Sequence, residues 1–251
     1  MSVEFEADAV VLDIEGTTSA TGFVTEVLYP YSRERLGRLL VERGDESDVR
    51  RATDQVRELL GEPEADAARV EQALTGWLDE DRKATPLKTL QGILWSEGFA
   101  RGELVSHFYD DVVPVLRRWR AAGLRQYVYS SGSVAAQRAW FAHSLNGDLL
   151  PLMDGFFDTE NAGPKQSADA YRTITAAIAI RPGRTLFLSD RPAELDAART
   201  AGWYTAGVRR PGEPYYDHGT GGHPEVRSFD HITVGSSVGQ ARPLPETSRG
   251  R

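Results

Sequence analysis

The chain has 251 residues, of which 40% are hydrophobic and 26% are charged, a balance typical of folded soluble proteins. Its formal net charge of −8 argues against a nucleic-acid partner, and the absence of cysteine excludes disulfides, thiolate metal sites and cysteine nucleophiles. The first residues show no signal-peptide pattern, and no apolar run is long enough to span a bilayer. We therefore expect a cytoplasmic protein with a small-molecule partner and no nucleic-acid or membrane partner.

A short apolar segment near the N-terminus predicts a buried strand that ends at a carboxylate. The segment runs from Ala9 to Asp13, and a polar turn follows it at Gly16, Thr17 and Thr18. Chemistry often takes place at such a strand end.

The next part of the sequence predicts a helical insertion. Between residues 21 and 105 apolar residues recur at helical spacing and β-branched runs are absent, so we expect a cap of about four helices with a small core of its own. Pro30 is expected to interrupt the first helix. Lys83 and Lys88 could reach a substrate when the cap closes, but charged runs of this kind are usually solvated, and we favour that interpretation.

Beyond the cap, predicted strands and helices alternate. Strands are expected at 125–130, near 156, at 184–189 and at 204–208, with helices at 110–122, 133–145, 167–179 and 193–201. This pattern predicts an α/β fold, a Rossmann-like, mostly parallel sheet with helices on both faces, plus the inserted all-helical cap. We assign residues 1–20 and 106–238 to the catalytic core and expect residues 239–251 to be a flexible tail.

Carboxylates follow two of the predicted strands, at Asp13 and Asp190. Ligands of open α/β sheets bind beyond the carboxyl ends of the strands, so these two side chains are expected to meet there. Mg²⁺ prefers a few carboxylate oxygens, which makes the pair a candidate metal site. Each residue could instead simply cap the helix that follows it.

Four further residues complete a candidate catalytic set. Glu15, two residues after Asp13, could protonate a leaving oxygen and then activate water, while Asp13 attacks phosphorus. Ser130 and Ser131 open a helix whose backbone could cradle phosphate, although an ordinary helix cap has the same sequence. Lys165 follows a turn and could neutralise charge on nucleophile and phosphate, although a single lysine is more often solvated.

Together these segments resemble the four motifs of the haloacid dehalogenase superfamily in their usual order. The glutamate two positions after the first aspartate, followed by Gly-Thr-Thr, is similar to the enolase-phosphatase family of methionine salvage, also called acireductone synthase. Further segments match that family over nearly the whole chain: Phe23 to Tyr31, Asp81 to Gly92, Tyr127 to Ser133 and Asp158 to Tyr171.

The resemblance implies a set of roles. One Mg²⁺ would be bound by the carboxylates of Asp13 and Asp190 and the backbone carbonyl of Glu15. Asp13 would form an aspartyl-phosphate, Glu15 would act as acid and base, and Lys165 would hold the phosphate and orient Asp13. Ser130 and Ser131 would hold the substrate.

The implied reaction has two steps. A monomer would enolise 2,3-diketo-5-methylthiopentyl-1-phosphate and then remove phosphate, giving the acireductone 1,2-dihydroxy-3-keto-5-methylthiopentene. A phosphatase for another small ester, a dehalogenase and a non-catalytic phospho-ligand-binding domain are the alternatives, and the acidic residues and the lysine argue against the last two. Arg191 departs from the family pattern, and we expect it to face solvent at the start of a helix.

Overall fold

The computed structural model describes residues 2–82 and 84–235, and a six-stranded parallel sheet lies at its centre. The strands are arranged in the order β4-β3-β2-β5-β6-β7, so the chain steps outward from β2 in one direction and later in the other. Their bounds are β2 (Ala9–Leu12), β3 (Arg125–Tyr129), β4 (Gly155–Phe157), β5 (Thr185–Ser189), β6 (Tyr204–Val208) and β7 (Glu225–Val226). This order places the topological switch point, where such sheets bind ligands, beside β2.

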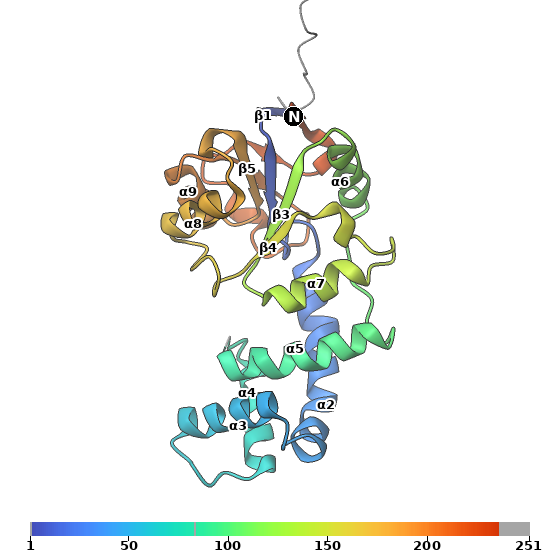
Figure 1. Cartoon of the computed structure of the whole chain (residues 1–251), viewed down its shortest axis with the longest axis vertical. Coiled ribbons are helices and arrows are strands. Elements are labelled where there is room, and N and C mark those ends of the chain that lie inside the picture. Colours follow the sequence, from blue (N-terminus) through green and yellow to red (C-terminus); the bar gives the residue numbers. More distant parts are fainter. Residues whose placement is uncertain (1, 83, 236–251) are drawn as a thin grey trace, which may run out of the picture.

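Helices cover both faces of the sheet (Figure 1). On one side lie α6 (Val112–Ala121) and α7 (Val134–Ala142), and on the other α8 (Ala168–Ile178) and α9 (Pro192–Thr200). Strand β2 serves both layers, because Val10 and Leu12 join the apolar cluster of one face while Ala9 and Val11 join that of the other. The predicted Rossmann-like α/β fold is confirmed.

A layer of helices stands beyond the carboxyl ends of the strands (Figure 1). It contains α1 (Thr21–Phe23), the π-helical turn η1 (Val24–Leu28), α2 (Tyr29–Glu42), α3 (Ser47–Leu60), α4 (Ala67–Asp79) and α5 (Thr85–Ala100). The prediction that Pro30 interrupts the first helix is wrong. Pro30 lies in the first turn of α2, after the π-helical turn has changed the hydrogen-bond pattern, so helical backbone continues from residue 21 to residue 42.

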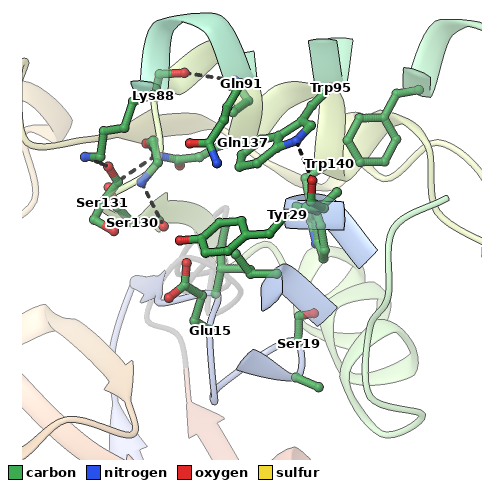
Figure 2. Close-up of a pocket in the computed structure, with 18 residues that line it drawn as sticks. Glu15, Ser19, Tyr29, Lys88, Gln91, Trp95, Ser130, Ser131, Gln137 and Trp140 are labelled. Atoms are coloured by element: carbon green, nitrogen blue, oxygen red, sulfur yellow. Dashed lines mark hydrogen bonds between the residues drawn. The ribbon is translucent and has the colours of Figure 1, made fainter. Parts of the chain in front are cut away.

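The apolar core of these helices is not separate from that of the sheet, contrary to the expectation of an independent cap core. The buried side chains of α2 to α5 form one continuous cluster with those between the sheet and α7. Phe23 and Phe99 pack edge-on against Trp140 of α7, with ring centroids 5.1 and 6.1 Å apart. A pocket remains between the two layers, and Figure 2 shows its lining.

Several short elements were not predicted. Strands β1 (Val3–Glu6) and β8 (Ile232–Gly235) form a separate two-stranded parallel sheet, and β7 extends the main sheet. Short 3₁₀ turns are η2 (Leu150–Leu152), η3 (Pro182–Arg184), η4 (Tyr216–His218) and η5 (Phe229–His231). Within the described part of the chain, no helix combines the length and apolar character needed to cross a membrane. Lys83 and the predicted tail at 239–251 lie outside the described residues.

Candidate active site

Three predicted site residues directly follow the ends of adjacent strands. Asp13 comes after β2, Ser130 after β3 and Asp190 after β5, and β2 is paired with both other strands. The backbone N–H of Asp13 donates to the carbonyl of Leu188 at 3.0 Å, which extends the pairing with β5 up to Asp13. The strand ends therefore bring together residues more than 170 positions apart in the sequence.

A tight turn orients the residues after Asp13. The backbone N–H groups of Thr17, Thr18 and Ser19 all donate to the carbonyl of Ile14, at 2.9 to 3.2 Å. The hydroxyl of Thr18 donates to the Asp13 carbonyl at 3.0 Å, and that of Thr17 to Asp13 Oδ2 at 3.3 Å. These bonds fix the carboxylate of Asp13, which is only 4% exposed.

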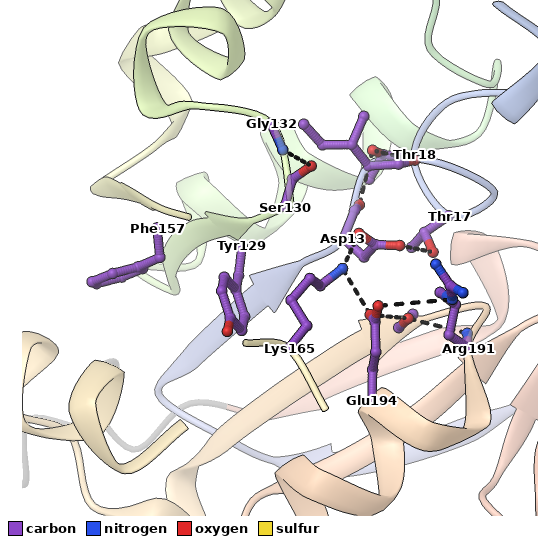
Figure 3. A network of polar contacts seen from close by, with 12 residues as sticks. Asp13, Thr17, Thr18, Tyr129, Ser130, Gly132, Phe157, Lys165, Arg191 and Glu194 are labelled. Atoms are coloured by element: carbon purple, nitrogen blue, oxygen red, sulfur yellow. Dashed lines mark hydrogen bonds and ion pairs between the residues drawn. The ribbon is translucent and has the colours of Figure 1, made fainter. Parts of the chain in front are cut away.

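Lys165 contacts Asp13 directly (Figure 3). Its ammonium is 2.5 Å from Asp13 Oδ1 and 2.7 Å from Glu194 Oε2, and the side chain is 9% exposed. Two buried tyrosines hold the loop that carries it, because Tyr171 donates to the Lys165 carbonyl at 2.8 Å and Tyr129 to the Gly163 carbonyl at 2.7 Å. The alternative of a solvated surface lysine is therefore wrong.

All six predicted site residues line one cleft, which we call the polar cleft. They are Asp13, Glu15, Ser130, Ser131, Lys165 and Asp190. The cap contributes Asp81 to this cleft, and the loop after β6 contributes Tyr215. The structure thus assembles the predicted set in one place, between the sheet and the helical layer.

The donors in the cleft fit a hard divalent cation. Asp190 Oδ1 is buried and has no hydrogen-bond partner within the part of the chain that the structure describes. Among residues 2–82 and 84–235 no group of three or more carboxylate or histidine side chains is suited to a metal, so Asp13 and Asp190 would act as a pair. Two carboxylates are enough for Mg²⁺, because it usually keeps water or phosphate oxygens at its other positions.

The pKa shifts of these carboxylates fit a site that binds a cation. Burial raises the pKa of Asp190, and the nearby carboxylates of Asp13 and Glu194 raise it further. Burial also raises the pKa of Asp13, an effect that the Lys165 ammonium opposes. Burial alone would lower the pKa of Lys165, but the charges of Asp13 and Glu194 outweigh it and hold the pKa above its ordinary value. Lys165 pairs with Asp13 and Glu194, and the half-exposed Arg191 guanidinium lies 3.9 Å from Glu194. Asp190 is therefore the carboxylate whose charge a bound cation would stabilise most.

The sequence analysis missed Glu194. This buried residue accepts a hydrogen bond from the Ser189 hydroxyl at 2.9 Å as well as pairing with Lys165. Glu194 lies in the first turn of α9, where acidic residues are common because of the helix dipole, so its sequence position did not distinguish it.

Arg191 was expected to face solvent, and this is only partly correct. Its side chain is 42% exposed, but it lines the polar cleft and donates a hydrogen bond to the Tyr215 hydroxyl. Its guanidinium also lies over the Tyr215 ring, 4.6 Å from the centroid. A cation therefore stands at the edge of the cleft.

A second, mostly apolar cavity adjoins the polar cleft, and we call it the apolar pocket (Figure 2). Its apolar lining includes Leu28, Trp95, Phe99 and Trp140. Glu15, Val24, Ser130 and Ser131 line both cavities. A ligand could therefore place an anionic group among the carboxylates and the lysine and an apolar group between the cap and α7.

Comparison with known proteins identifies the family. Residues 7–202 match the family model of the haloacid dehalogenase-like hydrolases. Enolase-phosphatase E1 of Streptomyces avermitilis is 70% identical over 238 residues, covering 95% of this chain and all of that protein. The chain belongs to the enolase-phosphatase E1 family of haloacid dehalogenase-like hydrolases. Enolase-phosphatase E1 of Frankia alni is 54% identical, with 91% of this chain and 96% of that protein covered.

Solved structures agree with this membership. The UTR4 protein of Saccharomyces cerevisiae superposes with a TM-score of 0.74 at 30% identity, covering 90% of this chain and 99% of that one. CbbY of Rhodobacter sphaeroides, solved in complex with phosphate, superposes with a TM-score of 0.55 at 18% identity. The superposition covers 93% of this chain and 98% of CbbY and shows that the two share a fold. The family predicted from the sequence motifs is confirmed.

Proposed function

We propose that the protein is the enolase-phosphatase of methionine salvage. It would convert 2,3-diketo-5-methylthiopentyl-1-phosphate to the acireductone and phosphate. The observation that carries this proposal is the continuity of the two cavities, since the substrate has a phosphate at one end, a methylthio group at the other and two ketones between them. The polar cleft suits the phosphate, and the apolar pocket suits the methylthio end.

In the phosphatase step Asp13 is the nucleophile. One carboxylate oxygen attacks phosphorus and forms an aspartyl-phosphate, while Glu15 protonates the oxygen that leaves with the enediol. Glu15 then takes a proton from water, which attacks the aspartyl-phosphate and regenerates Asp13. Lys165 holds Asp13 in place and neutralises charge as phosphate oxygens approach.

In the enolisation step a base removes a proton from the carbon between the phosphate and the first ketone. Glu15 is the carboxylate that lines both cavities, which makes it our candidate for this base. Ser130 and Ser131 line both cavities as well and would hold the substrate between its two ends. Mg²⁺, held by Asp13, Asp190 and the carbonyl of Glu15, would supply positive charge to the phosphate and to the enolate oxygen.

The helices between residues 21 and 105 would act as the cap of a core formed by residues 1–20 and 106–238. Closure of such a layer excludes water from the reacting groups. Every side chain assigned a role comes from one chain, so we propose that the monomer is active. We also place the reaction in the cytoplasm, because a phosphorylated substrate does not readily cross a membrane.

The test is phosphate release from the diketone phosphate, followed together with absorbance of the enol intermediate and the acireductone, with and without Mg²⁺. Wild type should produce acireductone and phosphate only with Mg²⁺. Asp13→Asn keeps the size of the side chain but removes the nucleophile, and it should release no phosphate. If wild type hydrolyses simple phosphate esters but leaves the diketone untouched, the enolase-phosphatase assignment fails and a phosphatase for another ester replaces it.

A further inference from the structure

The apolar pocket contains a buried amide donor without a partner. Gln91 lies on α5, is 4% exposed, and its Nε2 has no hydrogen-bond partner within the described residues. Figure 2 shows its amide pointing from the cap helix into the pocket, above Tyr29 and Glu15. An unpaired buried donor is unfavourable, and a water molecule or a ligand oxygen that accepts from it removes that cost.

Most other donors around this pocket are already used. Lys88 donates to the Ser131 carbonyl at 3.0 Å, and Trp95 Nε1 donates to Ser32 Oγ at 2.8 Å. Gln137 Nε2 donates to the carbonyls of Gly132 and Phe157, at 2.7 and 2.8 Å. These side chains position the walls of the pocket, whereas the Gln91 donor remains available to a ligand.

Trp140 Nε1 is the other buried donor of the pocket that lacks a partner in the described chain. Trp140 is enclosed by aromatic rings, since Phe23, Phe99 and Phe108 all pack against it. An unpaired N–H in such apolar surroundings does not by itself indicate a polar ligand. Gln91 is different, because Lys88, one helical turn earlier on α5, contacts Ser131, which lines both cavities.

The rest of the buried face of α5 is apolar. Leu87, Leu90 and Leu94 surround position 91 on this face. A leucine or methionine would fill position 91 without leaving a polar group unpaired, so packing alone does not account for glutamine. An acceptor supplied by a ligand does account for it.

We infer that the Gln91 amide N–H donates a hydrogen bond to a ketone oxygen of the substrate and so selects a keto substrate over a plain alkyl phosphate. The inference rests on the proposed function, because the ketones lie between the phosphate and the methylthio end. With those ends in the polar cleft and the apolar pocket, the ketones pass Glu15 and Ser131, below Gln91. A neutral donor suits this position because it can hydrogen-bond to a carbonyl oxygen. That hydrogen bond becomes stronger as the oxygen gains negative charge during enolisation.

The test compares two alkylphosphonates of equal length that differ by one ketone next to the phosphonate-bearing carbon. Their dissociation constants are measured by calorimetry, with Mg²⁺, for wild type, Gln91→Met and Gln72→Met. Methionine matches glutamine in length and has no donor, and Gln72 is a cap residue on α4 that does not line the apolar pocket. Wild type and Gln72→Met should bind the ketone compound about tenfold more tightly. In Gln91→Met the preference should fall to about twofold, because Mg²⁺ and the two serines still attract the ketone.

Four results would overturn the inference: no ketone preference in wild type, an undiminished preference in Gln91→Met, a preference lost in Gln72→Met, or loss of plain-phosphonate binding in Gln91→Met. Binding of the plain phosphonate by Gln91→Met at wild-type affinity shows that the cleft is intact, and its loss would assign Gln91 a purely structural role. Turnover of the diketone phosphate by wild type is measured separately. If wild type fails that assay, the proposed function falls, whatever the phosphonates show.

Discussion

Asp190 lies so close to Gly16 that a β-carbon on residue 16 would stand 2.2 Å from Asp190 Oδ2. Gly16 also has a φ of +71°, a conformation that other residues rarely adopt. The turn after Asp13 and the side chain of Asp190 therefore fit together only when residue 16 has no side chain. This contact couples the turn after Asp13 to the end of β5.

Gly16→Ala should displace the Asp190 carboxylate and weaken Mg²⁺ binding. We expect a loss of Mg²⁺-dependent activity of about 100-fold or more, since a small misplacement of reacting groups can cost that much. Gly61→Ala is the matched control, because Gly61 has a φ of +68° and a β-carbon added there would meet nothing within 4 Å, so this variant carries the same backbone strain without the clash. Calorimetric Mg²⁺ titration of both variants checks the prediction, and equal losses would contradict it.

Asp190→Asn should stabilise the metal-free protein while removing its response to Mg²⁺. Burial raises the pKa of Asp190, so a charged carboxylate here costs folding free energy when no cation is bound. We expect a gain of about 1–3 kcal/mol at neutral pH without metal, because the buried carboxyl must either carry its charge or take up a proton on folding, and the amide does neither. Thermal unfolding is measured with EDTA and with Mg²⁺.

Wild type should gain stability from Mg²⁺ in that experiment, and Asp190→Asn should gain none. Asp45→Asn serves as the control, since the Asp45 side chain is fully exposed. If Mg²⁺ stabilises Asp190→Asn to the same extent as wild type, Asp190 does not bind the metal.

The strand ends could be predicted because their physical signal is local. Each strand is an apolar run that stops at a polar residue, as at Leu12 before Asp13, and parallel topology then brings such ends to one edge. The helix expected at 133–145 ends earlier, at Ala142, because Ser144 forms a turn with Gly147 instead. The Ser144 side chain thus competes with the helix for backbone hydrogen bonds. The spacing of apolar residues along the sequence does not reveal such competition.

Glu194 and Gln91 could not be predicted in the same way. The role of Glu194 depends on the direction in which α9 leaves the sheet, which brings its carboxylate to Lys165. Gln91 interrupts an otherwise apolar face of α5, and its burial depends on how the cap packs on α7. Both roles arise from the relative placement of elements rather than from a pattern within one element.

Lys165→Met should destabilise the protein as well as inactivate it. The Lys165 ammonium is buried against Asp13 and Glu194, and removing it leaves both carboxylates without their cation. Breaking a buried pair in this way typically costs about 3–5 kcal/mol. Urea unfolding of the metal-free protein measures the effect.

Arg172→Met is the comparison for that variant, because Arg172 forms an exposed pair with Asp169 on α8. An exposed pair of this kind contributes about 0–1 kcal/mol. A loss for Lys165→Met no larger than that for Arg172→Met would show that Lys165 does not stabilise the buried carboxylates.

Glu213→Ala should weaken the contacts that fix the cap to the core. The Glu213 carboxylate accepts hydrogen bonds from the backbone N–H of Thr21, where the cap begins, and from the Tyr109 hydroxyl at 2.6 Å, where the chain returns to the core. Its loss leaves both donors unpaired, and we expect the free energy of unfolding to fall by about 1–3 kcal/mol and KM for the diketone phosphate to rise. Tyr109→Phe removes one of these donors but keeps the bond to Thr21, so its effect on KM should be smaller. If the two variants raise KM equally, the bond from Thr21 does not hold the cap in position.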